Sequence, residues 1–214
     1  MKHYPHLMSP LQIGTFTLKN RIEAAPMATS NLTSDAFFTP ENIYIYEQRA
    51  KGGAAIVNLG EARIDQKTGI SHKLTLALDN PDVLPSLLAA TDAIKRYDAI
   101  PGVEILHPGG RSNPEYYDGP IWAPSDAPGH LGKPYTALDE DTINYIVECF
   151  GNAAEMAMLG GVELITVHAG HGWLLHEFLS PLNNHRTDKF GGSLENRARI
   201  SLMVCLLYTS PSPR

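Results

Sequence analysis

Apolar residues in this chain form two kinds of pattern, short runs that are mainly apolar and stripes with helical spacing. The short runs predict strands, and the run at 162–167 predicts a buried parallel strand, because a strand covered on both faces is mostly apolar. These runs are residues 22–27, 54–59, 102–106 and 162–167. Helical stripes separate them, at residues 40–51, residues 79–99 and from residue 139 onward. Strands that alternate with helices predict an α/β fold with parallel strands.

The clearest helical stripe follows Asp139, whose side chain can cap the start of a helix. Glu140 and Asp141 then place negative charge in the first turn, where the helix dipole favours it. The apolar stripe consists of Ile143, Ile146, Val147, Phe150, Ala153, Ala154 and Ala157. In the helix predicted at 79–99 the shared face is Leu84, Leu87, Leu88, Thr91 and Ile94. Both stripes predict helices that pack on a sheet.

A short hairpin is expected ahead of the first strand. Residues 11–21 carry alternating apolar arms on either side of Gly14-Thr15. This arrangement is typical of two antiparallel strands joined by a tight turn.

Two architectures fit the strand and helix repeat. A doubly wound sheet needs a glycine-rich phosphate turn after its first strand, and this chain has APMATSNLTSDAFFTP there instead. A (β/α)₈ barrel builds its site from long loops after the strands, and the predicted loops are long, at 28–39, 61–78, 107–138 and 168–192. A complete barrel takes about 250 residues. The sequence therefore predicts the N-terminal half of a (β/α)₈ TIM barrel, about four βα units after the hairpin.

Composition narrows the functional classes. The 214 residues are 43% hydrophobic and 19% charged, with a net charge of −6, which disfavours a nucleic-acid or membrane partner. No apolar stretch approaches the roughly 18–20 residues of a membrane span, and the N-terminus has no signal-peptide core, so a cytoplasmic location is expected. Only Cys149 and Cys205 occur, too few for a cysteine-held cluster.

The last ten residues differ from what precedes them. The helix expected after Ser193 is amphipathic through Ile200, Met203 and Val204, and then CLLYTSPSPR follows without a cap. This tail resembles translated sequencing adapter, although a genuine flexible tail is the alternative. We therefore expect a partial barrel domain at residues 7–204 and a non-native tail at 205–214.

Two histidines stand where the last predicted strand ends. His168 and His171 could donate two hydrogen bonds to one carbonyl or phenolate oxygen, and strand ends carry the chemistry in α/β folds. Structural histidines or a metal site are the alternatives. A metal-dependent hydrolase would use the further His176 and His185, but Ser180 stands where a zinc motif beginning at His176-Glu177 needs its second histidine.

Four segments together resemble the Old Yellow Enzyme family, in particular its 2-enoate reductase and 2,4-dienoyl-CoA reductase branch. They are LMSPLQIGTFTLKNRIEAAPM, EQRAKGGAAIVNLGEA, VEILHPGGR and HAGHGWLLHEFLSPLNNHRTDKFGGSLENRAR. The resemblance covers about residues 7 to 204 and again implies half of a TIM barrel that binds FMN.

The resemblance implies a set of flavin-binding residues. Pro26, Met27 and Ala28 match the end of the first strand, beside the flavin ring. Ala62 matches a small residue next to the isoalloxazine, and Glu104 stands where many members have a glutamine that hydrogen-bonds the flavin's pyrimidine edge. A carboxylate there can accept from flavin N3–H but cannot donate to a carbonyl.

The resemblance also implies substrate-binding residues. His168 and His171 match the pair that holds the substrate oxygen, which makes them the predicted catalytic residues. Trp173 replaces a tyrosine that protonates the substrate in many members, and indole N–H is no usable acid at neutral pH. Arg111 matches the family's His-x-Gly-Arg motif, with one inserted residue.

The implied activity is hydride transfer from NADH or NADPH, through FMN, to the activated C=C bond of an unsaturated carbonyl compound. Any [4Fe-4S] cluster and FAD of the longer branch would belong to a missing C-terminal part. A small-molecule substrate, no metal ligands in this chain and self-association into a homo-oligomer are expected. The alternative is a truncated, non-functional fragment, since strands one and four would be open edges.

Overall fold

The computed structural model describes residues 4–29 and 31–209. It divides into two compact units, and each is treated by itself. The first, which we call the sheet unit, comprises Met1–Ala62, Leu74–Glu104 and Glu155–Thr166. The second, the loop unit, comprises Arg63–Lys73, Ile105–Ala154 and Val167–Arg214. The chain passes from the sheet unit into the loop unit at or near the C-terminal ends of three strands.

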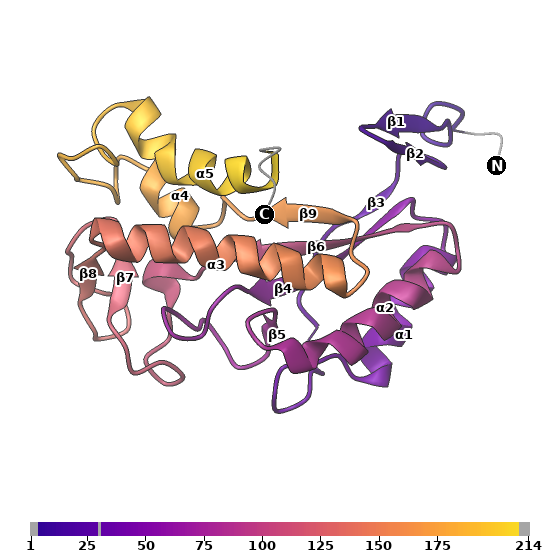
Figure 1. Ribbon diagram of the computed structural model, residues 1–214, viewed down its shortest axis with the longest axis horizontal. Coiled ribbons are helices and arrows are strands. Elements are labelled where there is room, and N and C mark those ends of the chain that lie inside the picture. Colours follow the sequence, from indigo (N-terminus) through magenta and orange to yellow (C-terminus); the bar gives the residue numbers. More distant parts are fainter. Residues whose placement is uncertain (1–3, 30, 210–214) are drawn as a thin grey trace. The chain divides into compact units, whose positions relative to one another are not determined.

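The sheet unit contains the hairpin and most of the parallel sheet (Figure 1). Strands β1 (Leu11–Ile13) and β2 (Phe16–Leu18) pair antiparallel around Gly14, whose φ of +54° suits the turn. The hairpin prediction is confirmed. The sheet has the order β3-β4-β6-β9, with β5 paired to β4. Its strands are β3 (Glu23–Ala24), β4 (Ile56–Arg63), β5 (Leu76–Ala77), β6 (Ile100–Leu106) and β9 (Leu164–Val167). Strand β3 runs parallel to β4, with Glu23 opposite Ile56.

Helices α1 (Pro40–Lys51) and α2 (Leu84–Lys95) pack side by side in the sheet unit (Figure 1). Helix α1 has the predicted bounds, and Thr39 and Asn42 form a capping box at its start. Helix α2 is shorter than predicted, because residues Pro81–Val83 form a 3₁₀ turn ahead of it. Leu88, expected on the buried face, is 41% exposed, whereas Leu87 and Ile94 are completely buried.

Helix α3 (Glu140–Leu159) begins in the loop unit and ends in the sheet unit. Asp139 Oδ1 accepts from the backbone N–H of Thr142 at 2.8 Å, as expected of a capping residue. The whole predicted stripe is buried: Ile143, Ile146, Val147, Phe150, Ala153, Ala154 and Ala157. The periodicity of this segment therefore identified the buried face correctly.

The loop unit has ordered elements where the sequence predicted only loops. They are the 3₁₀ turn η2 (Gly109–Arg111), strands β7 (Ile121–Ala123) and β8 (Tyr135–Ala137), and helix α4 (Leu174–Leu179). Strands β7 and β8 pair in parallel. Elements of three to six residues are too short to show a period.

Helix α5 (Leu194–Thr209) follows Ser193 as predicted, with Ile200 and Val204 fully buried. It continues through the first residues of the expected tail, and residues 210–214 lie outside the described part of the chain. The boundary at 204 stays a prediction. No helix among the described residues is long and apolar enough to cross a bilayer. The fold is α/β with the strand and helix repeat of half a (β/α)₈ barrel, as predicted.

Candidate active site

The histidine pair lies at the C-terminal end of β9. The backbone N–H of His168 donates to the carbonyl of Ile105 at 3.0 Å, which ties the start of this loop to the end of β6. His171 and Gly172 both have positive φ, +54° and +78°, so the chain turns sharply there. The turn brings His171 Nδ1 to 3.0 Å from His168 Nε2, with the two rings nearly perpendicular at 86°.

Hydrogen bonding assigns the tautomers of the pair. The Gly170 N–H donates to His168 Nδ1 at 3.2 Å, so neutral His168 carries its proton on Nε2 and can donate it. In the resting pair this donor faces His171 Nδ1. A carbonyl oxygen that approaches both nitrogens could accept from both, once the His171 proton resides on Nδ1.

Trp173 links the histidine pair to Arg111. Its ring lies edge-on to His168 at a centroid distance of 6.2 Å, and the Arg111 guanidinium carbon lies 5.7 Å from the indole centroid. The structure thus brings together four predicted residues, namely His168, His171, Trp173 and Arg111. Among the described residues the Arg111 side chain has no hydrogen bond or ion pair, and its backbone N–H donates to the Pro108 carbonyl at 3.1 Å.

A buried histidine, His107, organises the loop unit behind this site. Its Nδ1 accepts from the Gly109 N–H at 3.0 Å, so Nε2 donates to Thr68 Oγ1 at 3.1 Å, and Thr68 in turn donates to Asp65 at 2.7 Å. Burial lowers the pKa of His107 to about 3, so it stays neutral. The sequence marked His107 only as part of a motif, and this network joins the loops after β4 and β6.

Glu177 is a functional candidate that the sequence reasoning missed. Its carboxylate is 5% exposed and accepts from the Gly110 N–H at 3.0 and 3.2 Å, which fixes helix α4 against η2. Burial raises the pKa of Glu177 to about 7, although the Gly110 N–H and the Arg111 charge lower it in part. A single glutamate in an apolar segment gives no sequence signal that it will be buried and bind a backbone N–H. In the sequence, Glu177 stood out only as part of an incomplete zinc motif.

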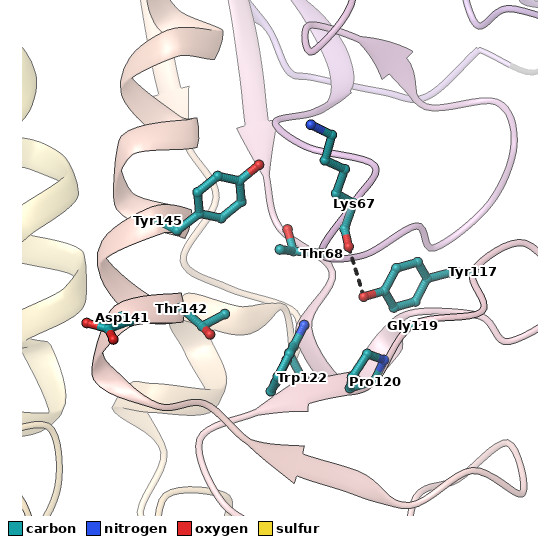
Figure 2. A pocket seen from close by; sticks show the side chains of 9 residues that line it. All are labelled: Lys67, Thr68, Tyr117, Gly119, Pro120, Trp122, Asp141, Thr142 and Tyr145. Carbon is teal, nitrogen blue, oxygen red and sulfur yellow. Dashed lines mark hydrogen bonds between the residues drawn. The ribbon is translucent and has the colours of Figure 1, made fainter.

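Two cavities open in the loop unit. One, of about 360 Å³, is lined by Arg111, His130, Tyr135, Gly172, His176, Glu177 and Asn183, and we call it the Arg111 pocket. The other, of about 430 Å³, contains no predicted site residue. Figure 2 shows Tyr117, Trp122 and Tyr145 around it, with the Tyr117 hydroxyl donating to the Lys67 carbonyl at 3.1 Å.

The predicted flavin-binding residues lie in the sheet unit. Met27 is 56% exposed, Ala28 is also exposed, and Pro26 and Glu104 are half-buried, whereas Ala62 is completely buried. The segment at Pro26 and Met27 lies against Gly60, where an added Cβ would come within 2.6 Å of the Met27 nitrogen.

Tyr46 holds this segment in place from helix α1. Its buried hydroxyl donates to the Gly60 carbonyl at 3.1 Å and lies 3.4 Å from the Met27 carbonyl. Burial raises the pKa of Tyr46, so the hydroxyl keeps its proton. The segment that follows β3 is therefore fixed against β4, and residues 27 and 28 are exposed.

A metal centre finds no support in the described residues, where no three histidine, cysteine, aspartate or glutamate side chains are grouped to hold an ion. The histidines of the rival hydrolase hypothesis have other contacts: His176 Nδ1 accepts from the Gly172 N–H at 2.8 Å.

Comparison with known proteins places the chain. Residues 6–205 match the model of the NADH:flavin oxidoreductase / NADH oxidase family. An NADH oxidase of Thermoanaerobacter brockii is 34% identical over 95% of this chain and 32% of its own length. An NADPH dehydrogenase of Bacillus pumilus is 34% identical over 90% of this chain and 56% of its own. The crystal structure of Old Yellow Enzyme from Pichia sp. superposes with a TM-score of 0.88 at 25% identity, over 94% of this chain and 55% of that one.

These comparisons bear on both fold and cofactor. The chain spans about a third to just over half of the length of these proteins. The family implies FMN as cofactor with NADH or NADPH as reductant. On the match across residues 6–205, the chain belongs to the NADH:flavin oxidoreductase / NADH oxidase family, as the Old Yellow Enzyme resemblance predicted.

Proposed function

We propose that this chain is part of an FMN-dependent oxidoreductase that reduces the activated C=C bond of an α,β-unsaturated carbonyl compound. The observation that supports this best is the histidine pair at the end of β9, with two ring nitrogens 3.0 Å apart. One oxygen atom can lie within hydrogen-bond distance of both nitrogens. Two donors at a carbonyl oxygen stabilise the negative charge that develops there when hydride reaches the β-carbon.

In this proposal His168 and His171 bind and polarise the substrate oxygen. His168 is the fixed donor, because the Gly170 N–H occupies its Nδ1. His171 is exposed and changes its tautomer to become the second donor. The positive φ at His171 requires a conformation that most side chains avoid, and a turn held so tightly keeps the second donor in place.

Trp173 binds the substrate and does not protonate it. Its ring packs between His168 and the Arg111 side chain, a position suited to stacking on a planar conjugated substrate. The proton that completes the reduction then comes from water or from another group. Arg111, whose guanidinium carbon lies 5.7 Å from the indole centroid, contributes positive charge to substrate binding.

The sheet-unit residues fit a flavin in part. Met27 and Ala28 are exposed and Pro26 is half-buried, and none of the three has a polar side chain, which suits contact with a flat ring. Glu104 would accept a hydrogen bond from the pyrimidine edge. Ala62 is buried and presents no open side-chain surface. When bound, FMN supplies the hydride chemistry, accepting hydride from NADH or NADPH and donating it to the substrate.

The proposal is tested by purifying the 214-residue chain and titrating it with FMN, followed by visible absorbance. NADPH oxidation that depends on 4-phenylbut-3-en-2-one is then measured with and without bound FMN. Stoichiometric FMN with enone-dependent oxidation is expected if these residues make a working site. In that case His168→Ala and His171→Ala should each lower kcat/KM by about 100-fold or more, with FMN still bound.

A colourless, inactive chain would instead favour the fragment hypothesis, in which activity needs residues beyond these 214. Bound FMN with activity that neither histidine substitution changes would contradict the assigned roles. Lys67→Gln, in the second cavity, is the matched surface control and should leave FMN binding and enone-dependent NADPH oxidation unchanged.

A further inference from the structure

The Arg111 pocket contains a guanidinium group whose N–H donors are not used by the described residues. Arginine is charged at every relevant pH, and its planar guanidinium matches a carboxylate with two parallel hydrogen bonds. In the described residues, the Arg111 guanidinium lies over the face of Trp173 and forms no hydrogen bond or ion pair. The guanidinium opens into the 360 Å³ cavity, so its donors are available to a ligand.

Other groups in the pocket are also suited to an anion. His176 accepts at Nδ1 from Gly172 N–H, so its Nε2 is left as a donor in the neutral ring. His130 shares its Nδ1 with the Tyr135 hydroxyl at 2.8 Å, which leaves its second ring nitrogen free for a ligand. The exposed side chain of Asn183 supplies an amide.

The one carboxylate of the pocket, Glu177, does not neutralise Arg111 by contact. Both of its oxygens face the Gly110 N–H, and the two side chains form no ion pair. The groups around Glu177 are Arg111 on η2, Tyr135 on β8, His130 in the preceding loop and His176 on α4. Because burial raises the pKa of Glu177 to about 7, the carboxyl group is largely protonated in mildly acidic solution and then repels an anion little.

The pocket lies close to the histidine pair. Trp173 contacts both His168 and Arg111, so the distance from the His168 ring to the guanidinium cannot exceed the sum of those two separations, 6.2 and 5.7 Å. Gly172, which follows His171 directly, lines the pocket. A molecule several bonds long could therefore reach both sites.

We propose that the Arg111 pocket binds a carboxylate group of the substrate, separated by a short spacer from the carbonyl that the His168–His171 pair holds. This inference rests on the proposed function for the identity of the ligand as substrate. It narrows the substrate class to unsaturated carbonyl compounds that carry a second, anionic group. A carboxylate ligand is repelled by ionised Glu177 and therefore favours its protonated form. The affinity of the pocket for this ligand should thus fall as the pH rises past 7.

Three probes test the proposal by calorimetric titration of the 214-residue chain at pH 6.5, without flavin. They are 4-phenylbut-3-en-2-one, the same enone with a carboxylate at the para position of the ring, and benzoate. The carboxylated enone should bind about tenfold more tightly than the neutral enone. Arg111→Gln should abolish this difference and weaken benzoate, whereas Lys67→Gln should change neither.

The Glu177→Gln variant provides a second, independent test of the pocket. The amide keeps an acceptor for the Gly110 N–H but cannot ionise. The affinity of the wild-type chain for the carboxylated enone should fall several-fold between pH 6 and pH 8. The Glu177→Gln variant should bind this enone at both pH values as tightly as the wild type does at pH 6. Should Arg111→Gln fail to fold by circular dichroism, Arg111→Lys keeps the charge without the planar fork and should give an intermediate loss.

Equal affinity for the two enones, with benzoate binding indifferent to Arg111→Gln, would overturn the proposal. Failure of the proposed function gives a different result. Suppose that benzoate affinity still depends on Arg111 while His168→Ala changes the affinity for neither enone. The pocket then binds anions, and its assignment to the substrate is wrong.

Discussion

The sheet unit and the loop unit are stabilised in different ways. The sheet unit depends on apolar side chains at regular spacing, such as Leu87 and Ile94, both fully buried. The loop unit also depends on single polar side chains that bind backbone groups, some of them near in sequence and some far away. Burial accumulates over many equivalent residues, whereas each polar tie is made by one residue. Sequence patterns reveal the first kind of stabilisation and conceal the second.

Asn184 and Arg186 illustrate the ties of the loop unit. The Asn184 amide donates to the Phe178 and Phe190 carbonyls, each at 2.8 Å. Arg186 Nη1 donates to the Pro124 and Leu138 carbonyls at 3.0 and 2.6 Å. The Asn184 bonds each span six residues of sequence, whereas the Arg186 bonds span 62 and 48 residues.

The largest effect is expected in the core of the sheet unit. Leu87 is fully buried and packs so closely on Gly160 that an added Cβ there would lie 2.2 Å from its Cδ2. Leu87→Ala should lower the free energy of unfolding by about 3 kcal/mol, through lost burial and a cavity. Urea denaturation measures the loss, and hydrogen exchange should locate it in α2. Leu88→Ala, on the 41% exposed neighbour, should cost far less, and equal losses would refute the assigned helix face.

A smaller loss is expected when one polar tie of the loop unit is removed. Asn184→Ala leaves two buried carbonyls without their donor and should cost about 2 kcal/mol. Faster amide exchange across residues 178–190, with α2 unchanged, would show that the tie acts locally. The exposed neighbour Asn183 provides the control, because Asn183→Ala should leave exchange unaltered.

Two buried ionisable groups of the loop unit, His107 and Glu177, predict opposing pH dependences. Between pH 3 and 6.5 folded His107 binds fewer protons than unfolded His107, so its stabilising contribution is lost as the pH falls. Between pH 4.5 and 7 folded Glu177 binds more protons than the unfolded form, so its contribution is lost as the pH rises. Each slope is about 1.4 kcal/mol per pH unit, and the two offset each other between pH 4.5 and 6.5.

Single substitutions should make each pH dependence of the free energy of unfolding measurable, by urea denaturation at pH 5 and pH 6. Relative to wild type, His107→Gln should become more stable as the pH falls, and Glu177→Gln as the pH rises. The double variant should again follow the wild-type pH dependence over this range. Parallel stability curves for all four proteins would mean that neither group has a shifted pKa.

The smallest effect concerns a local polar contact in the sheet unit. Thr39 caps α1 by accepting from the Asn42 N–H, within four residues of sequence. Thr39→Ala should lower stability by about 1 kcal/mol, and Thr39→Ser should restore most of it because the hydroxyl remains. A loss as large as that of Asn184→Ala would contradict the ranking of this local cap below the buried Asn184 hydrogen bonds of the loop unit.

The residues of the candidate site also fall into two groups, those that local sequence patterns predicted and those that only the structure revealed. His168 and His171 were predicted because they follow a recognisable strand and match a family motif. Glu177, Thr68 and the Arg111 pocket were not predicted. Their partners lie 39 or more residues away in the chain, at separations that no local pattern records.

The sequence by itself determined the strand and helix repeat, the buried face of α3, the hairpin and the family, because periodicity and motif spacing are local properties of the chain. Tertiary structure alone decided the length of α2, the short strands β7 and β8, and which side chains meet around Arg111. The physical reason is that a buried hydrogen bond or an unpaired cation depends on what else is nearby in space. Neighbours in space, unlike neighbours in sequence, are set only when the loops fold onto one another.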